Sequence, residues 1–333
     1  MNNGIAILNG KSIKKLICGK EQEIISIVKT AYSLHYEGKT SLPQSVFLRF
    51  LERERDRIIA LPSYIKGEKE VAGIKWISSF PNNIEKGVDR ASATVILNNM
   101  ENGRAFALLE GAQISSNRTA ASAALAAKCL HKNTEETTVG LIGIGLINFT
   151  ILRYLASVFP KINKLYIYDL NLSRSELFKK QVEEMYGNKF EVTIYNSYEE
   201  VLQKAKLISF ATTSSKPYIN DAGLVKPDMT ILHVSLRDLS EEVILGANNI
   251  VDDIDHVCRA ETSIHLTEKA EKNRDFINGV LAECFNDNVK MDSSKATIFS
   301  PFGLGMLDIS LSQYLYEQAV DQNMLTYIDD FYD

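Results

Sequence analysis

The middle of the chain alternates short apolar runs with longer amphipathic segments. Strands are predicted at Val139 to Ile142, Leu165 to Tyr168, Phe190 to Tyr195, Leu207 to Thr212 and Thr230 to Ser235, with a further one ending at Ile250 to Asp253. Helices are predicted at Ile147 to Val158, at Ser173 to about Tyr186 with a capping box from Ser173 to Glu176, and at Ser197 to Ala205. Strands that alternate with helices are typical of a parallel sheet covered on both faces. The pattern therefore predicts a doubly wound α/β domain.

The N-terminal third has a different pattern, in which one helix is followed by strands. Glu21 to Tyr36 carries apolar residues at helical spacing, and Ser12 could cap a helical turn before it. Strands are predicted at Ile5 to Leu8, Val46 to Phe50, Arg57 to Leu61, Val71 to Ser78, Ala93 to Asn98 and Ala105 to Glu110. Turns are predicted at Pro62–Ser63, Lys66–Gly67 and Pro81 to Asn83. Such a meander predicts a separate α+β domain with a mainly antiparallel sheet.

Composition narrows the class of protein. The chain has 333 residues, enough for two domains, and its 45% hydrophobic and 24% charged residues are typical of a globular protein. A net charge of −5 without a dense Lys/Arg block argues against nucleic acid or a membrane as partner. No apolar run is long enough to cross a membrane, and Met1 to Gly4 does not contain the basic residues that begin a signal peptide. The four cysteines form no C-x-x-C pair; they are Cys18, Cys129, Cys258 and Cys284. We therefore expect a cytoplasmic protein with reduced thiols and no metal site.

A glycine turn stands between the first strand and the first helix of the α/β region. Gly143 and Gly145 allow a tight turn, and Leu146 and Ile147 open the helix that follows. Backbone N–H groups and the positive end of the helix dipole meet at such a turn, which suits a pyrophosphate. Asn148 replaces the third glycine of the usual dinucleotide motif. An ordinary strand–turn–helix is the alternative.

An acidic residue after the next strand supports the interpretation of the turn as part of a dinucleotide-binding site. Asp169 ends the strand Leu165 to Tyr168, at about the distance where a carboxylate accepts hydrogen bonds from the adenosine ribose. This carboxylate would repel a 2′-phosphate, so NAD is the expected cofactor, although Arg174 could serve NADP. Thr212 and the loop Ser235 to Asp238 follow other strands of the same sheet and are expected at the same crevice. For Asp238, an ordinary turn residue at a strand end is the alternative.

Several cations fall on the predicted N-terminal strands or just after them. They are Arg49, Arg57, Lys75, Arg90 and Arg118. Cationic side chains on strands often pair with neighbouring carboxylates. Lys75 differs because it lies in an apolar run, where a charged amine needs a partner. An anionic ligand is one candidate for that partner. Ser115 or Ser116 could cap an alanine-rich helix, which would place Arg118 and Thr119 in its first turn, a position that favours an anion.

Four segments together resemble one known family. They are Gly73 to Trp76, Ser116 to Ala121, Leu141 to Gly145 and Ser300 to Ile309. In this order they resemble the lysine strand, the Arg-Thr-Ala-Ala signature, the nucleotide turn and the closing segment of the ornithine cyclodeaminase/mu-crystallin family. Asp56 to Ser63, Gly73 to Ile77 and Arg90 to Ser92 resemble in particular the branch that releases 2,3-diaminopropionate.

The resemblance implies an organisation and a set of site residues. It implies a homodimer, a substrate-binding and dimerisation domain at 1–115 with 305–333, and a dinucleotide-binding Rossmann domain at 116–304. Arg118 and Lys75 would bind the α-carboxylate of an amino-acid substrate, and Asp238 would be the catalytic acid, with Lys75 as a second proton-handling candidate. Gly143, Gly145, Leu146, Ile147, Asp169, Thr119, Thr212 and Ser235 would bind the cofactor.

The implied activity is an NAD-dependent oxidation of a secondary amine. N-(2-amino-2-carboxyethyl)-L-glutamate would be cleaved to 2-oxoglutarate and 2,3-diaminopropionate, a building block of siderophores and related peptides. Such a substrate has three carboxylates, for which Arg49, Arg57 and Arg90 are the expected extra cations. Leu239 to Glu242 replaces the Pro, Gly and Lys of cyclodeaminases, which argues against cyclodeamination. The alternatives are an ornithine cyclodeaminase, a ketimine or imino-acid reductase, and a non-enzymatic NAD(P)H-binding sensor.

Overall fold

The computed structural model describes residues 4–332, so the expectation about a leader at Met1 to Asn3 lies outside the described residues. The chain divides into two compact units, Met1–Arg118 with Gly303–Asp333 and Thr119–Phe302. The boundaries expected from the sequence were 115 and 304. Among the described residues, no helix is both long enough and apolar enough to cross a membrane.

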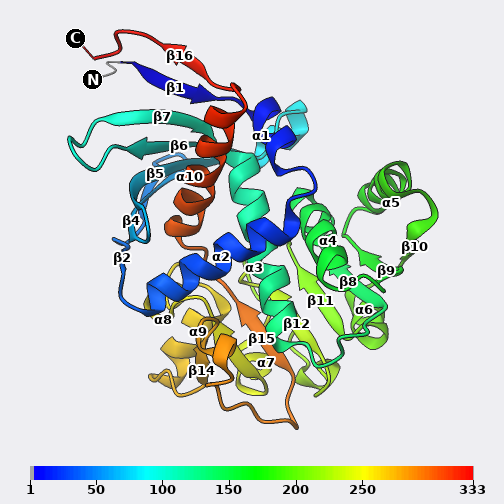
Figure 1. Ribbon diagram of the computed structural model, residues 1–333. Coiled ribbons are helices and arrows are strands. Elements are labelled where there is room, and N and C mark those ends of the chain that lie inside the picture. The colour runs from blue at the N-terminus through cyan, green and yellow to red at the C-terminus, as the bar shows by residue number, and fades with distance from the viewer. Residues whose placement is uncertain (1–3, 333) are drawn as a thin grey trace. The chain divides into compact units, whose positions relative to one another are not determined.

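Unit 1 is built on a mixed eight-stranded sheet, here called sheet A (Figure 1). Its strands are β1 (Ile5–Leu8), β2 (Thr40–Ser41), β3 (Val46–Phe50), β4 (Arg53–Lys66), β5 (Glu70–Ser79), β6 (Ala91–Asn98), β7 (Ala105–Glu110) and β16 (Thr326–Ile328). The order is β16-β1-β7-β6-β5-β4-β2, with β3 paired to β4. All pairs are antiparallel except β1 with β7, which confirms the predicted mainly antiparallel sheet.

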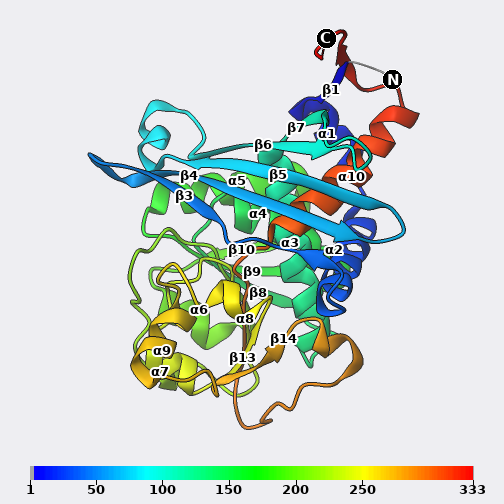
Figure 2. The same ribbon diagram turned by 90° about the vertical axis from the view of Figure 1, so that its left-hand side faces the viewer.

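Three α-helices and one 3-10 helix of the described residues lie wholly within unit 1. They are α1 (Gly10–Ile17), α2 (Glu21–Tyr36), α10 (Gly305–Asp321) and the 3-10 helix η1 (Pro81–Lys86). α10 packs against β4, β5 and β6, and Figure 2 shows it beside the long β4–β5 pair. A Cβ on Gly305 would lie 3.0 Å from the Leu61 carbonyl oxygen, so the glycine lets α10 begin close to β4. The last helix of the chain thereby covers one face of sheet A.

Two local predictions for unit 1 are wrong. The predicted turn at Pro62–Ser63 lies inside β4, which runs unbroken from Arg53 to Lys66. β3 ends its pairing at Ala60 and β2 begins at Tyr64, so on this side of β4 no partner strand needs an N–H from Pro62. The first helix is capped by Asn9, whose side chain accepts the Ser12 N–H, and not by Ser12.

The start of α3 (Gly111–Leu130) also differs from the prediction. The Glu110 carboxylate accepts the N–H groups of Ala112 and Gln113 at 2.7 and 3.1 Å and so takes the capping role. The helix therefore begins before Ser115, and Arg118 and Thr119 lie beyond its first turn. The predicted placement of these two residues in the first turn is wrong.

Unit 2 is built on an eight-stranded parallel sheet, here called sheet B, which confirms the predicted doubly wound fold. Its strands are β8 (Thr138–Ile142), β9 (Lys164–Tyr168), β10 (Glu191–Ile194), β11 (Leu207–Phe210), β12 (Thr230–His233), β13 (Asn248–Val251), β14 (Ile277–Val280) and β15 (Thr297–Ser300). The order is β10-β9-β8-β11-β12-β15-β13-β14. It reverses between β8 and β11, the place where such folds bind dinucleotides.

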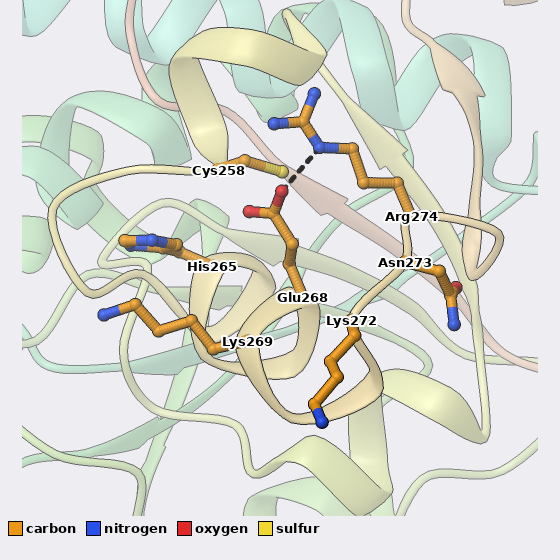
Figure 3. A pocket seen from close by; sticks show the side chains of 7 residues that line it. All are labelled: Cys258, His265, Glu268, Lys269, Lys272, Asn273 and Arg274. Carbon is orange, nitrogen blue, oxygen red and sulfur yellow. Dashed lines mark hydrogen bonds and ion pairs between the residues drawn. The ribbon is translucent and has the colours of Figure 1, made fainter.

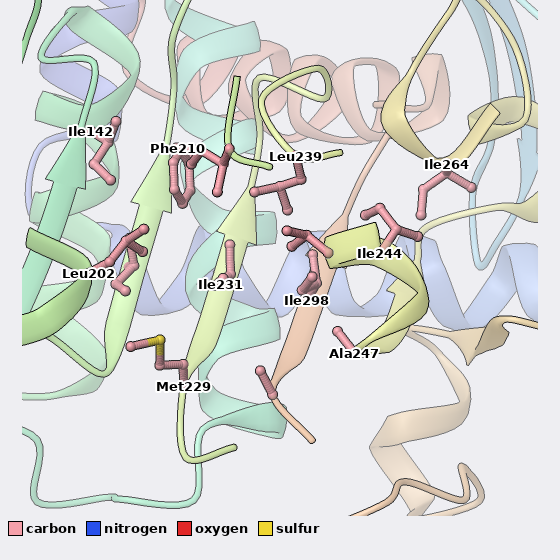
Figure 4. Close-up of a cluster of buried hydrophobic side chains, with 14 of the residues drawn as sticks. Ile142, Leu202, Phe210, Met229, Ile231, Leu239, Ile244, Ala247, Ile264 and Ile298 are labelled. Carbon is pink, nitrogen blue, oxygen red and sulfur yellow. The ribbon is translucent and has the colours of Figure 1, made fainter. Parts of the chain in front are cut away.

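The helices of unit 2 enclose an apolar core against this sheet. They are α4 (Leu146–Val158), α5 (Leu172–Tyr186), α6 (Tyr198–Lys204), α7 (Glu241–Leu245), α8 (Ile254–Val257) and α9 (Ser263–Glu271). Short 3-10 turns are η2 (Gly187–Lys189), η3 (Ala222–Leu224) and η4 (Glu283–Asn286). Figure 4 shows Phe210, Ile231 and Ile298 from neighbouring strands in one buried cluster with Leu202 of α6 and Ile244 of α7. The capping box at Ser173 is wrong, because Asn171 caps α5 by accepting the Ser173 N–H.

Candidate functional site

The glycine turn of unit 2 has the shape that a pyrophosphate needs. Gly143 has a φ of +78°, and a Cβ there would lie 2.8 Å from the Ala211 carbonyl oxygen, so only glycine fits. Gly145 caps α4 without any side-chain hydrogen bond, and Leu146 and Ile147 begin the helix. The N–H groups of the first turn of α4 therefore have no side-chain cap, which fits a bound phosphate.

Asn148, the departure from the glycine motif, holds this turn together. Its side chain is fully buried and donates to the carbonyl oxygens of Ile142 and Gly143 at 3.1 and 2.8 Å. Its Oδ1 accepts the Ser209 hydroxyl at 2.7 Å. The amide thus joins the turn to β8 and β11, so the substitution restrains the turn and does not abolish it.

Asp169 is attached to the same turn. One carboxylate oxygen accepts the Ile144 N–H at 3.0 Å, and the other accepts the Asn171 N–H at 3.0 Å. Arg174 reaches the turn from α5, because a Cβ on Gly145 would lie 3.6 Å from a terminal guanidinium nitrogen. The structure therefore brings Gly143, Gly145 and Asp169 together as predicted. Thr119 lies half-buried within α3.

Asp238 lies in a buried polar cluster at the carboxyl ends of β11 and β12. Its side chain is fully buried and accepts hydrogen bonds from the hydroxyl groups of Thr212 and Ser235. Nε2 of His233 lies 3.2 Å from Oδ2 of Asp238, and Nδ1 of the same ring lies 3.2 Å from the Ser300 hydroxyl. The structure thus brings together the predicted residues Thr212, Ser235 and Asp238.

The electrostatics of the cluster keep Asp238 ionised. Burial alone would raise the pKa of Asp238, but hydrogen bonds from His233, Ser235 and Thr212 outweigh it and hold the pKa below its usual value. Burial, and then the charge and hydrogen bond of Asp238, raise the pKa of the Tyr218 phenol. Sequence reasoning missed His233 and Tyr218, although a histidine at the end of an apolar strand was a usable signal.

The loop that carries Asp238 is clamped from outside. Leu236 adopts a left-handed conformation with a φ of +73°, which is unfavourable for a bulky residue. The Leu236 carbonyl accepts the Ser263 N–H at 2.7 Å, and the Arg237 guanidinium donates to the carbonyl oxygens of Ala260 and Glu261. These contacts fix the backbone on which Asp238 sits.

In unit 1, Lys75 and Arg118 share a buried carboxylate. Nζ of Lys75 lies 2.6 Å from Oδ2 of Asp308, and Nε of Arg118 lies 3.2 Å from Oδ1. Ser115 Oγ accepts from both cations at 3.3 Å. The predicted need of Lys75 for a partner is thus met by a protein side chain. Asp308 lies in the closing segment Ser300 to Ile309, but nothing in the sequence identified it as the partner of Lys75.

The charges of this cluster do not cancel. Burial, together with the Arg118 charge, lowers the pKa of Lys75 to about 8, although Asp308 acts in the opposite direction. Burial alone would raise the pKa of Asp308, but Arg118 and Lys75 outweigh it and hold the pKa below its usual value. When Lys75 is protonated, two cations face one carboxylate, and one positive charge remains in excess.

The other three predicted cations form a row across sheet A. Arg49 of β3 lies opposite Arg57 of β4, Arg57 lies opposite Ser79 of β5, and the Ser79 hydroxyl accepts a hydrogen bond from Arg90 at 3.0 Å. Directly opposed residues share a face of the sheet, and Ser79 shares its face with Lys75, four residues earlier. Like charges placed opposite one another are destabilising unless an anion relieves them. This arginine row and the Lys75 cluster therefore lie on one face of sheet A.

A surface hollow on unit 2 contains none of the predicted site residues. Figure 3 shows Cys258, Glu268 and Arg274 in it, and the Arg274 Nε donates to Glu268 at 2.7 Å. Burial, and then nearby Glu268, raise the pKa of Cys258 to about 12, so the thiol stays protonated and unreactive. Arg274 is also paired with Asp255.

Comparisons with known proteins place the chain in a family. Residues 7–323 match the model of the ornithine cyclodeaminase/mu-crystallin family. N-((2S)-2-amino-2-carboxyethyl)-L-glutamate dehydrogenase of Staphylococcus aureus is 29% identical, and the match covers 98% of each chain. The structure of Thermococcus litoralis Δ1-pyrroline-2-carboxylate reductase with NADH and L-proline has a TM-score of 0.89 at 26% identity, covering 97% of this chain and 99% of that one. An archaeal alanine dehydrogenase dimer with bound NAD has a TM-score of 0.86 at 25% identity, covering 98% and 100%.

The fold, the glycine turn and these relatives define an NAD-dependent oxidoreductase. The chain belongs to the ornithine cyclodeaminase/mu-crystallin family. The predicted family, fold class and cofactor are thereby confirmed. The relatives named above act on different amino or imino acids, so the substrate has to be argued from the side chains of this chain.

Proposed function

We propose that this protein oxidises N-(2-amino-2-carboxyethyl)-L-glutamate with NAD and releases 2-oxoglutarate and L-2,3-diaminopropionate. The observation that carries the proposal is the distribution of cations on one face of sheet A. The Lys75 cluster has one positive charge in excess when Lys75 is protonated, and the arginine row supplies three more about four residues away along β5. A substrate with three carboxylates matches this distribution better than alanine, proline or ornithine, each of which has one.

Arg118 and Lys75 would bind one carboxylate of the substrate. Arg118 is held at its Nε by Asp308 and at one terminal nitrogen by Ser115, so the guanidinium is oriented before a ligand arrives. Such preorganisation lowers the entropic cost of positioning the substrate. Arg49, Arg57 and Arg90 would bind the remaining carboxylates.

Lys75 is the residue that we assign to proton transfer. NAD supplies the hydride acceptor when it is bound. Loss of hydride from the glutamate Cα requires a neutral secondary amine, because an ammonium has no lone pair for the C=N bond. An amine with a pKa of about 8 can accept that proton near neutral pH and return it when water cleaves the imine. Asp238 is the other candidate for proton transfer, and like Lys75 it is buried and bonded to protein side chains.

The product suggests a place for the reaction in metabolism. We infer that the 2,3-diaminopropionate enters a siderophore or a peptide antibiotic and that the reaction is cytoplasmic.

We also infer a homodimer formed through unit 1. On the face of sheet A opposite to Lys75, Val46, Leu48 and Trp76 are 63%, 46% and 44% exposed, and Val46, Ala60 and Trp76 are neighbours across three strands. An exposed apolar sheet face of this kind is typical of an interface.

The test is an assay of the purified protein with NAD and N-(2-amino-2-carboxyethyl)-L-glutamate. We expect NADH and 2-oxoglutarate in equal amounts. Ornithine with NAD, and Δ1-pyrroline-2-carboxylate with NADH, are the parallel substrates. Proline and ammonia from ornithine, or faster turnover of the cyclic imine, would mean that the substrate assignment is wrong and would favour the cyclodeaminase or the reductase.

A further inference from the structure

The amine of Lys75 has fewer partners than a lysine ammonium can serve. Nζ donates to Oδ2 of Asp308 at 2.6 Å and to Oγ of Ser115 at 3.3 Å, and among residues 4–332 these are its two hydrogen-bond partners. An ammonium has three N–H donors, whereas a neutral amine has two and a lone pair. In the neutral form both hydrogens are therefore used, and the lone pair points along the remaining tetrahedral direction. The protein thus holds this amine with its nucleophilic electron pair turned away from its partners.

Two features of the surroundings make the neutral amine available. The Lys75 side chain is 2% exposed, and burial disfavours the charged form. The guanidinium of Arg118 repels a second positive charge, and burial and this charge together lower the pKa of Lys75 to about 8. A lysine that is desolvated beside another cation is activated for attack on a carbonyl group.

The proposed oxidation brings a ketone to this amine. In the proposed function, on which this inference rests, Lys75 takes a proton from the substrate amine and returns it when water cleaves the imine. Lys75 is then neutral again. The 2-oxoglutarate that has formed carries its ketone next to the carboxylate that Arg118 and Lys75 bind. A 2-oxo acid held by that carboxylate therefore brings its carbonyl carbon to the Lys75 amine.

The charges around Lys75 match those of a protonated Schiff base. While Lys75 is neutral, Asp308 balances Arg118, so a bound carboxylate leaves one negative charge in excess. A protonated imine at Lys75 restores neutrality, because two cations then face two carboxylates. Oδ2 of Asp308 lies 2.6 Å from Nζ of Lys75, so the counter-ion is in place before any ligand binds.

We propose that Lys75 is a covalent binding site for 2-oxo acids, at which its amine and the ketone form a reversible Schiff base with Asp308 as the counter-ion. The Nζ lone pair adds to the carbonyl carbon, the carbonyl oxygen leaves as water, and a C=N bond replaces the C=O bond. Nothing is oxidised or reduced, so the step requires no cofactor. Hydrolysis of the C=N bond regenerates the amine and the 2-oxo acid.

The test traps the Schiff base in the purified protein without NAD and without an oxidisable substrate. The protein is incubated at a pH of about 8 with 2-oxoglutarate and cyanoborohydride, which adds hydride to the imine carbon and leaves a stable secondary amine. Peptide mass spectrometry compares Lys75 with Lys66, an exposed lysine at the end of β4. We expect Lys75 to be labelled about tenfold faster or more, as for an activated amine.

Two further small molecules show whether a carboxylate guides the reaction. Glutarate has both carboxylates of 2-oxoglutarate but no ketone, and it should suppress the labelling of Lys75 and leave that of Lys66 unchanged. Acetone has a ketone but no carboxylate, and it should label Lys75 no faster than Lys66.

Asp308→Asn separates the counter-ion from the nucleophile. The amide keeps the shape of the side chain but removes its negative charge, so we expect the labelling of Lys75 to slow by about tenfold or more. Lys75→Arg keeps a cation and should remove the adduct at this position. Lys66→Arg, at the exposed lysine, is the matched control and should leave the labelling of Lys75 unchanged.

Two results would overturn the proposal. One is a wild type in which Lys75 is labelled no faster than Lys66. The other is labelling of Lys75 that glutarate does not reduce or that acetone produces equally well, which would indicate a reactive lysine without a 2-oxo acid site. If Asp308→Asn or Lys75→Arg does not fold, glutarate protection of the wild type decides between the same outcomes.

The experiment also distinguishes this site from the proposed function. An adduct at Lys75 in a protein that forms no NADH from N-(2-amino-2-carboxyethyl)-L-glutamate would support the covalent site and refute the proposed oxidation. NADH formation without an adduct at Lys75 would refute the covalent site alone.

Discussion

At the scale of single residues, the buried charges of unit 1 were only half predictable. The apolar neighbours of Lys75 showed that its amine needed a partner, because an isolated buried charge is too costly. The partner is Asp308, 233 residues away in sequence, and no local pattern connects the two. For Asp238, the sequence suggested a functional carboxylate at a strand end, but not the four side chains around it, which come from separate loops and strands.

The low pKa of Lys75 leads to a pH dependence of the proposed oxidation. Only the neutral amine accepts the substrate proton, so kcat/KM should rise with pH and level off above about 8. Lys75→Met should lower kcat by about a hundredfold or more and remove this rise, while NADH binding stays unchanged. Steady-state rates between pH 6 and pH 10, with calorimetry for NADH, measure both effects. A Lys75→Met protein with an unaltered pH profile would rule out the assignment.

The arginine row separates the proposed substrate from its rivals. Arg49→Glu should raise KM for N-(2-amino-2-carboxyethyl)-L-glutamate about tenfold or more, because it replaces a charge-assisted contact by a repulsion. Lys66→Glu, an exposed cation on the same hairpin but on the other face of sheet A, is the matched control and should leave KM within about twofold. An unchanged KM in Arg49→Glu would favour a substrate with a single carboxylate.

At the scale of elements, most strands and helices were predictable, and several of the errors lie at their ends. Pro62 was interpreted as a turn, but it lies within β4, opposite Ile74 of β5, at a gap between β3 and β2 on the other side of the strand. α3 begins before its expected serine cap because the carboxylate of Glu110, a strand residue, caps it. β14 and β15 were not predicted, because each has only four residues, too few to show a period by itself. Ends are decided by side-chain hydrogen bonds, which hydrophobic patterns do not report.

The turn that leads into β8 contains a further carboxylate, whose effect on stability depends on pH. Glu136 accepts the N–H groups of Thr137 and Thr138 at 2.9 Å each and lies 3.3 Å from His131 Nε2. Burial alone would raise the pKa of Glu136, but these hydrogen bonds outweigh it and lower the pKa to about 2. A depressed carboxyl pKa stabilises the fold above the unfolded value of 4.5, and this contribution is lost as the pH falls towards 2.

Glu136→Gln should therefore lower the free energy of unfolding by about 2 kcal/mol at pH 7, and the difference from wild type should shrink between pH 4.5 and pH 2. Urea titrations over this range measure it. Glu135→Gln, at an exposed neighbour, is the control and should change stability by less than about 0.5 kcal/mol. A difference that stays constant down to pH 2 would contradict the assignment.

At the scale of the whole molecule, the two kinds of sheet followed from the patterns, but the pairing of distant strands did not. The change from a meander to strict alternation predicted an antiparallel and a parallel sheet, and both are present. No pattern indicated that β16 would pair with β1, or that β15 would insert between β12 and β13. Such pairings are chosen by the surfaces that remain to be covered once the local elements have formed.

The uncovered apolar face of sheet A leads to a prediction about assembly. We expect a dimer in solution, and Leu48→Glu combined with Trp76→Glu should convert it to a monomer by burying charge in the interface. Light scattering coupled to size exclusion gives the mass directly. Leu177→Glu on α5, at a similarly exposed leucine, should stay dimeric. A monomeric wild type at micromolar concentration would refute the prediction.

Because unit 1 is discontinuous in sequence, the two units can complete their folds at different times during translation. The residues of unit 2 are contiguous, so this unit can complete its fold as soon as its last strand has been made. Strands β1 to β7 of sheet A are synthesised first, yet α10, Asp308 and β16 come last. Until translation ends, the face that carries Lys75 has neither its covering helix nor its counter-charge, and the edge of β1 lacks the partner strand β16. The nascent protein thus passes through a stage in which unit 2 is complete while the earliest-made sheet still exposes the surfaces that the final thirty or so residues will cover.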